Sequence, residues 1–172
     1  NNRINGEKMT NLVNSLPNRN GMSPGDLFVV CNDKGEENWC SVSDVLIARG
    51  KNWNTKWQNG DPYKGVGSGV ITMTTAKAIG ETIKLGIKAS DAIFIDGVRG
   101  TLSQDGTMQS YTLTSNTLTI RGNVVELSCA GNQLTSLDVS SCTSLISLNC
   151  QNNELTSLDV ASCISLISLN SQ

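Results

Sequence analysis

Histidine is absent from the chain. This absence removes Ser-His and Cys-His nucleophile pairs, imidazole metal ligands and the side chain that most often moves protons near neutral pH. It argues strongly against most classes of enzyme, and no cofactor is expected. Aromatic residues are also scarce, at 4% of the chain, and all of them lie at or before Tyr111. The C-terminal third therefore lacks the tryptophan and tyrosine anchors that dominate tight protein interfaces.

Strong charge and long apolar runs are missing as well. The chain has 13 basic and 15 acidic residues, a net charge of −2 and no basic cluster. The electrostatic footprint of a nucleic-acid-binding protein is therefore absent, and nucleic acid is not an expected partner. There is no run of about 18 apolar residues, and the first residues do not resemble a signal peptide. We expect no membrane insertion by this segment and no export signal within it.

A repeat of 21 residues takes up the last part of the chain. The sequence Leu-Thr-Ser-Leu-Asp-Val occupies residues 134–139 and returns letter for letter at residues 155–160. Residues 124–134 and 145–155 both match L-x-x-L-x-[LC]-x-x-N-x-L, which is the leucine-rich-repeat pattern. A fixed period with fixed apolar positions predicts stacked copies of one structural unit.

Each repeat is predicted to begin with a short parallel strand. Leu148 and Cys150 alternate toward the interior of that strand. Asn132 and Asn153 are expected to stack as a ladder and to bond backbone groups where the strands turn, so their role is structural. A period of 21 residues leaves too little chain for a full helix. Residues 156–160 are therefore predicted to be extended.

Four cysteines recur with the repeat and form two columns. Cys129 and Cys150 lie on the strands, while Cys142 and Cys163 lie on the return side. Neighbouring strands are about 4.8 Å apart, but parallel side chains suit a disulfide poorly. No Cys-x-x-Cys spacing indicates a zinc or redox motif. We expect buried thiols that pack as small apolar groups and have no catalytic role.

Asp138 and Asp159 also recur one repeat apart. They could be paired catalytic carboxylates or metal ligands. Strand spacing would place the two charges about 5 Å apart in a solvated row, and no third ligand recurs with them. Capping of a turn is the favoured reading, and no metal site is predicted.

Residues 1–64 are predicted to alternate helix and strand. Apolar residues at helical spacing precede Pro17, and a serine and an acid at capping-box spacing open a second helix. This order predicts helices packed on one side of a parallel sheet. The expected elements are a helix within residues 1–17, an apolar strand at 27–31 covered on both sides, a helix from Ser41 to a cap at Gly50, and a strand between Trp53 and Trp57.

Residues 65–122 are predicted to form a small β cap of four or five short strands, because apolar and polar residues alternate. The cap starts with a glycine-rich connector at residues 65–69. A phosphate-binding loop is the alternative there, but it would require a helix next, and residues 70–75 have the composition of a strand. Residues 96–106 are read as a solvated turn rather than a calcium loop.

The outward positions of the repeat strands are the candidate binding face. They form one aliphatic row and two rows of mostly small polar residues, which would need many repeats acting together to hold a partner. The candidate residues are Val125, Ile146 and Ile167; Glu126, Ser147 and Ser168; and Ser128, Asn149 and Asn170.

With these motifs the chain resembles bacterial cell-surface leucine-rich-repeat proteins of the internalin-like kind. Residues 124–172 carry the most specific part of the resemblance. The helix-bearing end of a preceding repeat array in such proteins is similar to residues 2–17, together with Lys51-Asn-Trp53 and Tyr63-Lys-Gly65. Residues 80–122 are similar to the β cap that starts the next array. The resemblance implies an exported adhesion protein at the cell surface, which contacts host or community proteins or glycans.

The sequence therefore predicts an α/β leucine-rich-repeat solenoid that is rich in β structure and carries a small all-β cap or insertion. Its expected parts are a helix and strand end of an array at residues 1–64, the β cap at 65–122 and the repeats at 123–172. The predicted function is non-enzymatic extracellular recognition of protein or glycan through the sheet face. A structural spacer between two arrays is the alternative. Both chain ends fall within repeat motifs, so end-to-end self-association is expected.

Overall fold

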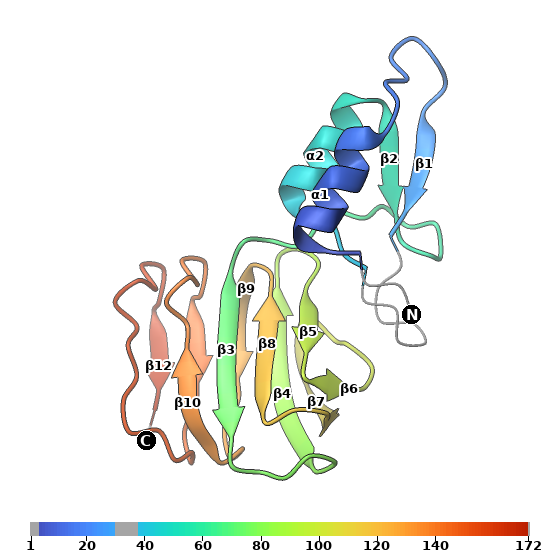
Figure 1. The fold of residues 1–172 in the computed structure, drawn as a ribbon. Coiled ribbons are helices and arrows are strands. Elements are labelled where there is room, and N and C mark those ends of the chain that lie inside the picture. The colour runs from blue at the N-terminus through green and yellow to red at the C-terminus, as the bar shows by residue number, and fades with distance from the viewer. Residues whose placement is uncertain (1–3, 30–37, 172) are drawn as a thin grey trace. The chain divides into compact units, whose positions relative to one another are not determined.

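The computed structural model describes residues 4–29 and 38–171 (Figure 1). The chain divides into two compact units, residues 1–67 and residues 68–172. They are called unit 1 and unit 2 below. The finer division of unit 2 into a β cap and repeats stays a prediction, and strands from both segments share its sheets.

Unit 1 combines two helices with a two-stranded parallel sheet. The helix predicted before Pro17, the helix after Ser41 and the strand after Trp53 are all confirmed. The strand predicted at residues 27–31 is not covered on both sides, because the Phe28 side chain is 52% exposed, and residues 30 and 31 lie outside the described residues. The elements are α1 Gly6–Ser15, β1 Gly25–Phe28, α2 Val42–Gly50 and β2 Trp53–Lys56.

The start of α2 is fixed by a capping box. The Ser41 hydroxyl accepts a hydrogen bond from the Asp44 amide at 3.1 Å, and the Asp44 carboxylate accepts one from the Ser41 amide at 2.9 Å. The other carboxylate oxygen of Asp44 accepts a hydrogen bond from the Thr10 hydroxyl and so joins α2 to α1. The predicted cap at Gly50 is wrong. Gly50 ends the helix, and the left-handed conformation falls on Asn52 (φ 62°), whose side-chain amide donates to the loop before β1.

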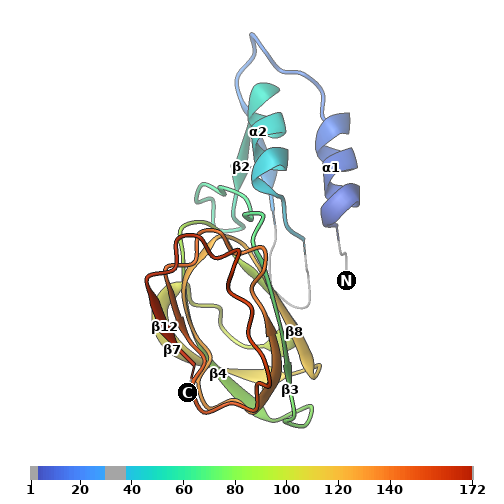
Figure 2. The same ribbon diagram turned by 90° about the vertical axis from the view of Figure 1, so that its left-hand side faces the viewer.

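Unit 2 consists of two β-sheets around one core. A four-stranded sheet has the order β10-β3-β8-β5, and a six-stranded sheet has the order β12-β11-β9-β4-β7-β6. Figure 2 shows the sheet containing β3 and β8 facing the sheet containing β4, β7 and β12. The strands are β3 Val70–Thr75, β4 Thr82–Ala89, β5 Phe94–Asp96, β6 Val98–Arg99, β7 Asp105–Leu113, β8 Thr117–Arg121, β9 Val124–Ser128, β10 Leu134–Asp138, β11 Ser147–Asn149 and β12 Ser168–Asn170.

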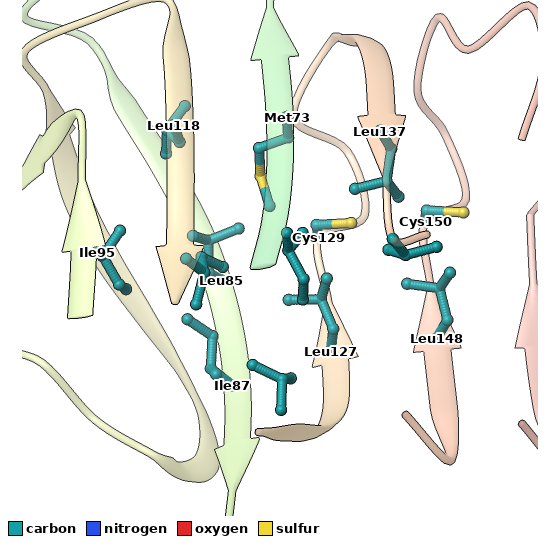
Figure 3. Packing of buried hydrophobic residues seen from close by; sticks show 14 of the residues in the cluster. Met73, Leu85, Ile87, Ile95, Leu118, Leu127, Cys129, Leu137, Leu148 and Cys150 are labelled. Carbon is teal, nitrogen blue, oxygen red and sulfur yellow. The ribbon is translucent and has the colours of Figure 1, made fainter. Parts of the chain in front are cut away.

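Apolar side chains from both sheets fill the space between them. Residues of the predicted cap and of the predicted repeats belong to a single buried cluster. In Figure 3, Met73 and Leu118 of one sheet and Leu85, Leu127 and Leu148 of the other belong to this cluster. Burial of such side chains contributes about 1.5–3 kcal/mol each, so this shared core is the main source of stability in unit 2.

The structure corrects the predicted fold class. A leucine-rich-repeat solenoid stacks parallel strands, but in the described part of unit 2 only β9, β11 and β12 are parallel neighbours. The other strand pairs of this unit are antiparallel, and the two described helices both lie in unit 1. The prediction of an α/β leucine-rich-repeat solenoid is therefore wrong. Alternation of apolar and polar residues is the same in parallel and antiparallel strands, so it could not reveal the direction of pairing.

The predicted cap contains six strands, β3 to β8, where four or five were expected. The extra strand is β6, which interrupts the stretch at residues 96–106 that was predicted to be a turn. After the glycines, residues 70–75 form strand β3, as predicted, so the helix required by a phosphate-binding loop is not there. Gly69 packs closely on the chain, because a side chain at this position would lie 2.6 Å from the Gly122 carbonyl oxygen.

Strands β4 and β3 take the place that an earlier repeat would occupy. The Asn132 side chain donates to the Lys84 carbonyl at 2.8 Å and accepts from the Lys84 amide at 3.0 Å. On the return side, the Cys142 thiol donates to the Val70 carbonyl, and the Cys163 thiol makes the same bond to the Val139 carbonyl one repeat later. The cap therefore supplies backbone hydrogen-bond partners to the side chains of the first repeat. The first repeat supplies equivalent backbone partners to the side chains of the second.

Candidate functional site

The candidate binding face is the outer surface of the six-stranded sheet, called the sheet face below. Its rows follow directly from the strand register. Ser147 of β11 is paired with Glu126 of β9 and with Ser168 of β12. Two residues further along, Asn149 is paired with Ser128 and with Asn170 in the same way. The structure therefore brings the two predicted polar rows together on neighbouring strands.

The aliphatic row lies beside the starts of the same strands, because Val125 is the second residue of β9 and Ile146 and Ile167 directly precede β11 and β12. Backbone hydrogen bonds join Ile146 to Val125 and Ile167 to Ile146, so the three residues are neighbours across the sheet. The Ile146 side chain is 39% exposed and that of Ile167 is 86% exposed. Exposed isoleucines beside small polar residues give the sheet face an apolar contact strip.

Strand β4 extends both polar rows beyond the repeats. Lys88 is paired in register with Glu126, and Gly86 with Ser128. The Lys88 ammonium and the Glu126 carboxylate form an ion pair at 2.7 Å, in which both side chains are about half exposed. Exposed ion pairs contribute at most about 1 kcal/mol to stability. The pair mainly sets the charge pattern of the sheet face.

Strand β7 adds an apolar side chain to the middle of the sheet face. Met108 is paired with Gly86, and a side chain placed on Gly86 would come within 2.8 Å of the Met108 sulfur. The Met108 side chain is nevertheless 50% exposed. A flexible thioether over a glycine gives a surface that can adapt its shape to a partner.

Amide side chains continue the polar row past the strand ends. The Asn170 side chain donates to the Gln151 side-chain oxygen at 2.9 Å, and the Gln151 amide donates to the Asn149 side chain at 3.3 Å. These side chains expose further donors and acceptors at the surface. The row can therefore recognise polar groups without a net charge of its own.

Asn153 holds neighbouring repeats at a fixed spacing. Its side-chain oxygen accepts from the Asn132 amide at 2.9 Å and from the Leu134 amide at 3.0 Å. Its side-chain nitrogen donates to the carbonyls of Cys129 at 3.0 Å and Cys150 at 2.8 Å. The predicted asparagine ladder is confirmed, and it positions the backbone under the sheet face.

The four repeat cysteines are buried, as predicted. Burial raises the pKa of the Cys129 thiol from its ordinary 9.0 to about 12, with a further contribution from nearby Cys150. Burial is also the main cause that raises the pKa of Cys142 to about 11, and it raises the pKa values of Cys150 and Cys163. Protonated thiols are poor nucleophiles and poor metal ligands.

The recurrent aspartates cap turns. The Asp138 carboxylate accepts from the Ser140 amide at 2.9 Å, which lowers the pKa of Asp138, and Asp159 accepts from the Ala161 amide at the same distance. Asp105, in the region considered for calcium, accepts from Ser103 and Thr107, and these bonds lower its pKa to about 2. Asp138 and Asp159 each bond the backbone two residues further on, which confirms the predicted capping of turns.

Sequence reasoning missed the part of the sheet face that the cap contributes. Lys84 and Lys88 alternate with buried apolar residues in β4, and that alternation was visible. What was not visible is the pairing of β4 with β9, which joins residues 38 positions apart in the Lys88 and Glu126 pair. Long-range antiparallel pairing leaves no local signal in the sequence.

The comparison with known families bears on the strands just described. Residues 122–170 match the family model of the leucine-rich repeats, in two copies. Leucine-rich repeats are typically non-enzymatic motifs that bind proteins on an extended surface, so the match indicates a protein-interaction module. No curated protein and no solved structure gives a significant match. Among the described helices, neither is long and apolar enough to cross a membrane.

Proposed function

We propose that the chain is an extracellular recognition module that binds a surface protein of a host or neighbouring cell through the sheet face. The observation that carries this proposal is the register of the rows. Polar residues of β9, β11 and β12 align with Lys88 and Gly86 of β4, so one continuous surface extends across both predicted segments. Location at the cell surface rests on the resemblance of the repeats to those of surface proteins.

A protein is a better partner for this surface than a glycan. The sheet face offers an aliphatic strip, a half-exposed methionine and an ion pair, which suit the mixed side chains of a polypeptide. Tyr111, on β7, is buried on the inner side, so it does not supply an aromatic ring to the surface. Glycans remain the second class of partner to be tested.

The experiment is surface capture of extracellular-matrix proteins and glycans by the soluble chain and by two double variants. Ser147→Arg/Asn149→Arg places two bulky charges on the sheet face, at alternate positions of β11. Thr117→Arg/Thr119→Arg is the matched control, because it places the same charges at alternate positions of β8 in the other sheet. We expect saturable binding that only the first variant abolishes, while both keep the circular dichroism of the wild type.

A structural spacer between two repeat arrays is the second candidate. It is favoured by the small polar side chains of the sheet face and by the way β3 and β4 supply backbone partners to the first repeat. In that case neither double variant changes any binding property. Equal loss of binding in the two variants would also contradict recognition through the sheet face.

A further inference from the structure

The sheet face carries positive charges at the end that the cap strands β4, β7 and β6 form. Lys84 of β4 is paired in register with Ser110 of β7, and Arg99 of β6 is paired with Thr112 of β7. Each of these four residues is exposed and follows or precedes a residue that packs in the core of unit 2. Lys84 and Arg99 therefore lie on the two sides of β7, with two hydroxyl groups between them.

These two cations have no carboxylate partner within the described part of the chain, unlike the other charges of the sheet face. The Glu126 carboxylate is paired with Lys88, and the Asp105 carboxylate accepts hydrogen bonds within its own turn. A third cation lies close to the same place, because the Lys77 ammonium donates to the Thr82 carbonyl of β4 at 2.8 Å. The unpaired charges of this region are therefore positive.

Pairing of the strands, rather than local sequence, assembles this charge. Lys77, Lys84 and Arg99 are separated along the chain, and the net charge of the whole chain is −2. Glu81, which directly precedes β4, supplies one negative charge, and its carboxylate accepts a hydrogen bond from the Ala78 amide in the turn. Three cations beside one carboxylate leave a local excess of positive charge on a chain that is acidic as a whole.

The neighbouring side chains indicate which anion fits. Lys84 and Arg99 are two strands and one row apart, so their Cα atoms are roughly 12 Å from each other, and both long side chains can reach one carboxylate between them. The hydroxyls of Ser110 and Thr112 supply further donors. Met108 lies at the next outward position of β7 and is half exposed. A polypeptide offers a carboxylate beside an apolar side chain, whereas an acidic glycan has no large apolar side chain to place on Met108.

We propose that this end of the sheet face binds an acidic segment of a polypeptide, with its carboxylates at Lys84 and Arg99 and an apolar neighbour on Met108. The inference rests on the proposed function and names the chemistry of the partner. Complementary charge speeds association and excludes partners of the wrong sign, and its effect weakens as salt is added. A basic segment would be repelled from the same place.

Short peptides displayed on phage and selected on the immobilised whole chain provide the probes. We expect the selected peptides to share an aspartate or glutamate next to an aliphatic or aromatic residue, and their affinity to fall as the salt concentration rises. Lys84→Glu/Arg99→Glu should weaken the binding of a selected peptide by about tenfold or more. Arg49→Glu/Lys64→Glu is the matched control, because it makes the same change of charge at exposed positions of unit 1, and it should leave the affinity unchanged.

An exchange of charges separates direct contact from damage to the fold. A selected peptide whose acidic residues are replaced by lysine should no longer bind the wild type and should bind the Lys84→Glu/Arg99→Glu variant. Selection of peptides without acidic residues, failure to select any peptide, or equal loss of binding in the two double variants would overturn the proposal. So would binding of a sulfated glycan such as heparin in place of the peptides.

The outcome for the proposed function is read separately, on the repeat strands. If Ser147→Arg/Asn149→Arg abolishes capture while Lys84→Glu/Arg99→Glu changes neither capture nor peptide binding, recognition through the sheet face stands and the acidic partner is excluded. If neither double variant changes capture, the proposed function fails as well.

Discussion

Asn153 joins two repeats through a single amide side chain. Its four short hydrogen bonds reach two amides and two carbonyls of the backbone, three of which belong to the preceding repeat. Such groups lie at corners, where the strand ends and the ladder of the sheet can no longer supply partners. One side chain therefore fixes both the corner and the spacing between neighbouring strands.

Replacing Asn153 by alanine should lower the free energy of unfolding by roughly 2 to 4 kcal/mol, because several partly buried backbone groups lose their partners together. Asn149→Ala, on the sheet face, is the control and should change stability by less than about 0.5 kcal/mol. Urea denaturation followed by circular dichroism measures both values. Equal stability of the two variants would show that water replaces the amide of Asn153 without loss.

The buried Cys129 thiol predicts a dependence of stability on pH. Its pKa is 9.0 when exposed and about 12 in the folded chain, so between these values the unfolded state loses a proton that the folded state keeps. Stability is unaffected below pH 9.0 and falls as the pH rises from 9.0 toward 12. We therefore expect the unfolding free energy of the wild type to fall relative to that of Cys129→Ala as the pH rises from 9.0 toward 12. A difference in unfolding free energy between the two proteins that stays constant over this pH range would contradict the raised pKa.

At the scale of the elements, α2 begins with the capping box, in which the side chains of Ser41 and Asp44 each accept a hydrogen bond from the backbone amide of the other. Ser41→Ala removes the acceptor for the Asp44 amide and leaves the buried Asp44 carboxylate with fewer donors. Loss of a serine cap costs about 1 kcal/mol, and up to about 2. We expect this decrease in urea denaturation monitored by tryptophan fluorescence, since all three tryptophans precede residue 58. Ser43→Ala, within the same helix turn, is the control.

Local patterns predicted the elements better than their partners. The capping box and the spacing of Met9 and Val13 indicated both helices, because the determinants lie within one or two turns. Phe28 was misread, since an apolar side chain does not reveal whether its strand lies at an edge. The polar rows of the sheet face were predicted because the 21-residue period fixes their register. Lys88 was missed because its partner, Glu126, lies far away in the chain.

At the scale of the molecule, unit 2 contains a complete core of its own. The buried cluster extends from Ile71 to Cys163, and none of its members belongs to residues 1–67. We therefore expect residues 68–172 to fold when produced alone, with a cooperative thermal transition and a β-type circular dichroism spectrum. Sharp, dispersed amide resonances in a nuclear magnetic resonance spectrum would provide the same answer. A spectrum of an unfolded chain would show that residues 1–67 are required for folding.

The hydrogen bonds between Asn132 and Lys84 also bear on how such a chain can change length. Asn153 bonds backbone groups of the first repeat, much as Asn132 bonds those of Lys84 in β4. A gene that duplicated or lost a stretch of 21 codons would therefore encode a sheet with one repeat more or fewer and an unchanged first strand. Recombination between near-identical copies, such as those at residues 134–139 and 155–160, is the event that would produce it. Repeat number, and with it the area of the sheet face, can vary between lineages without redesign of the fold.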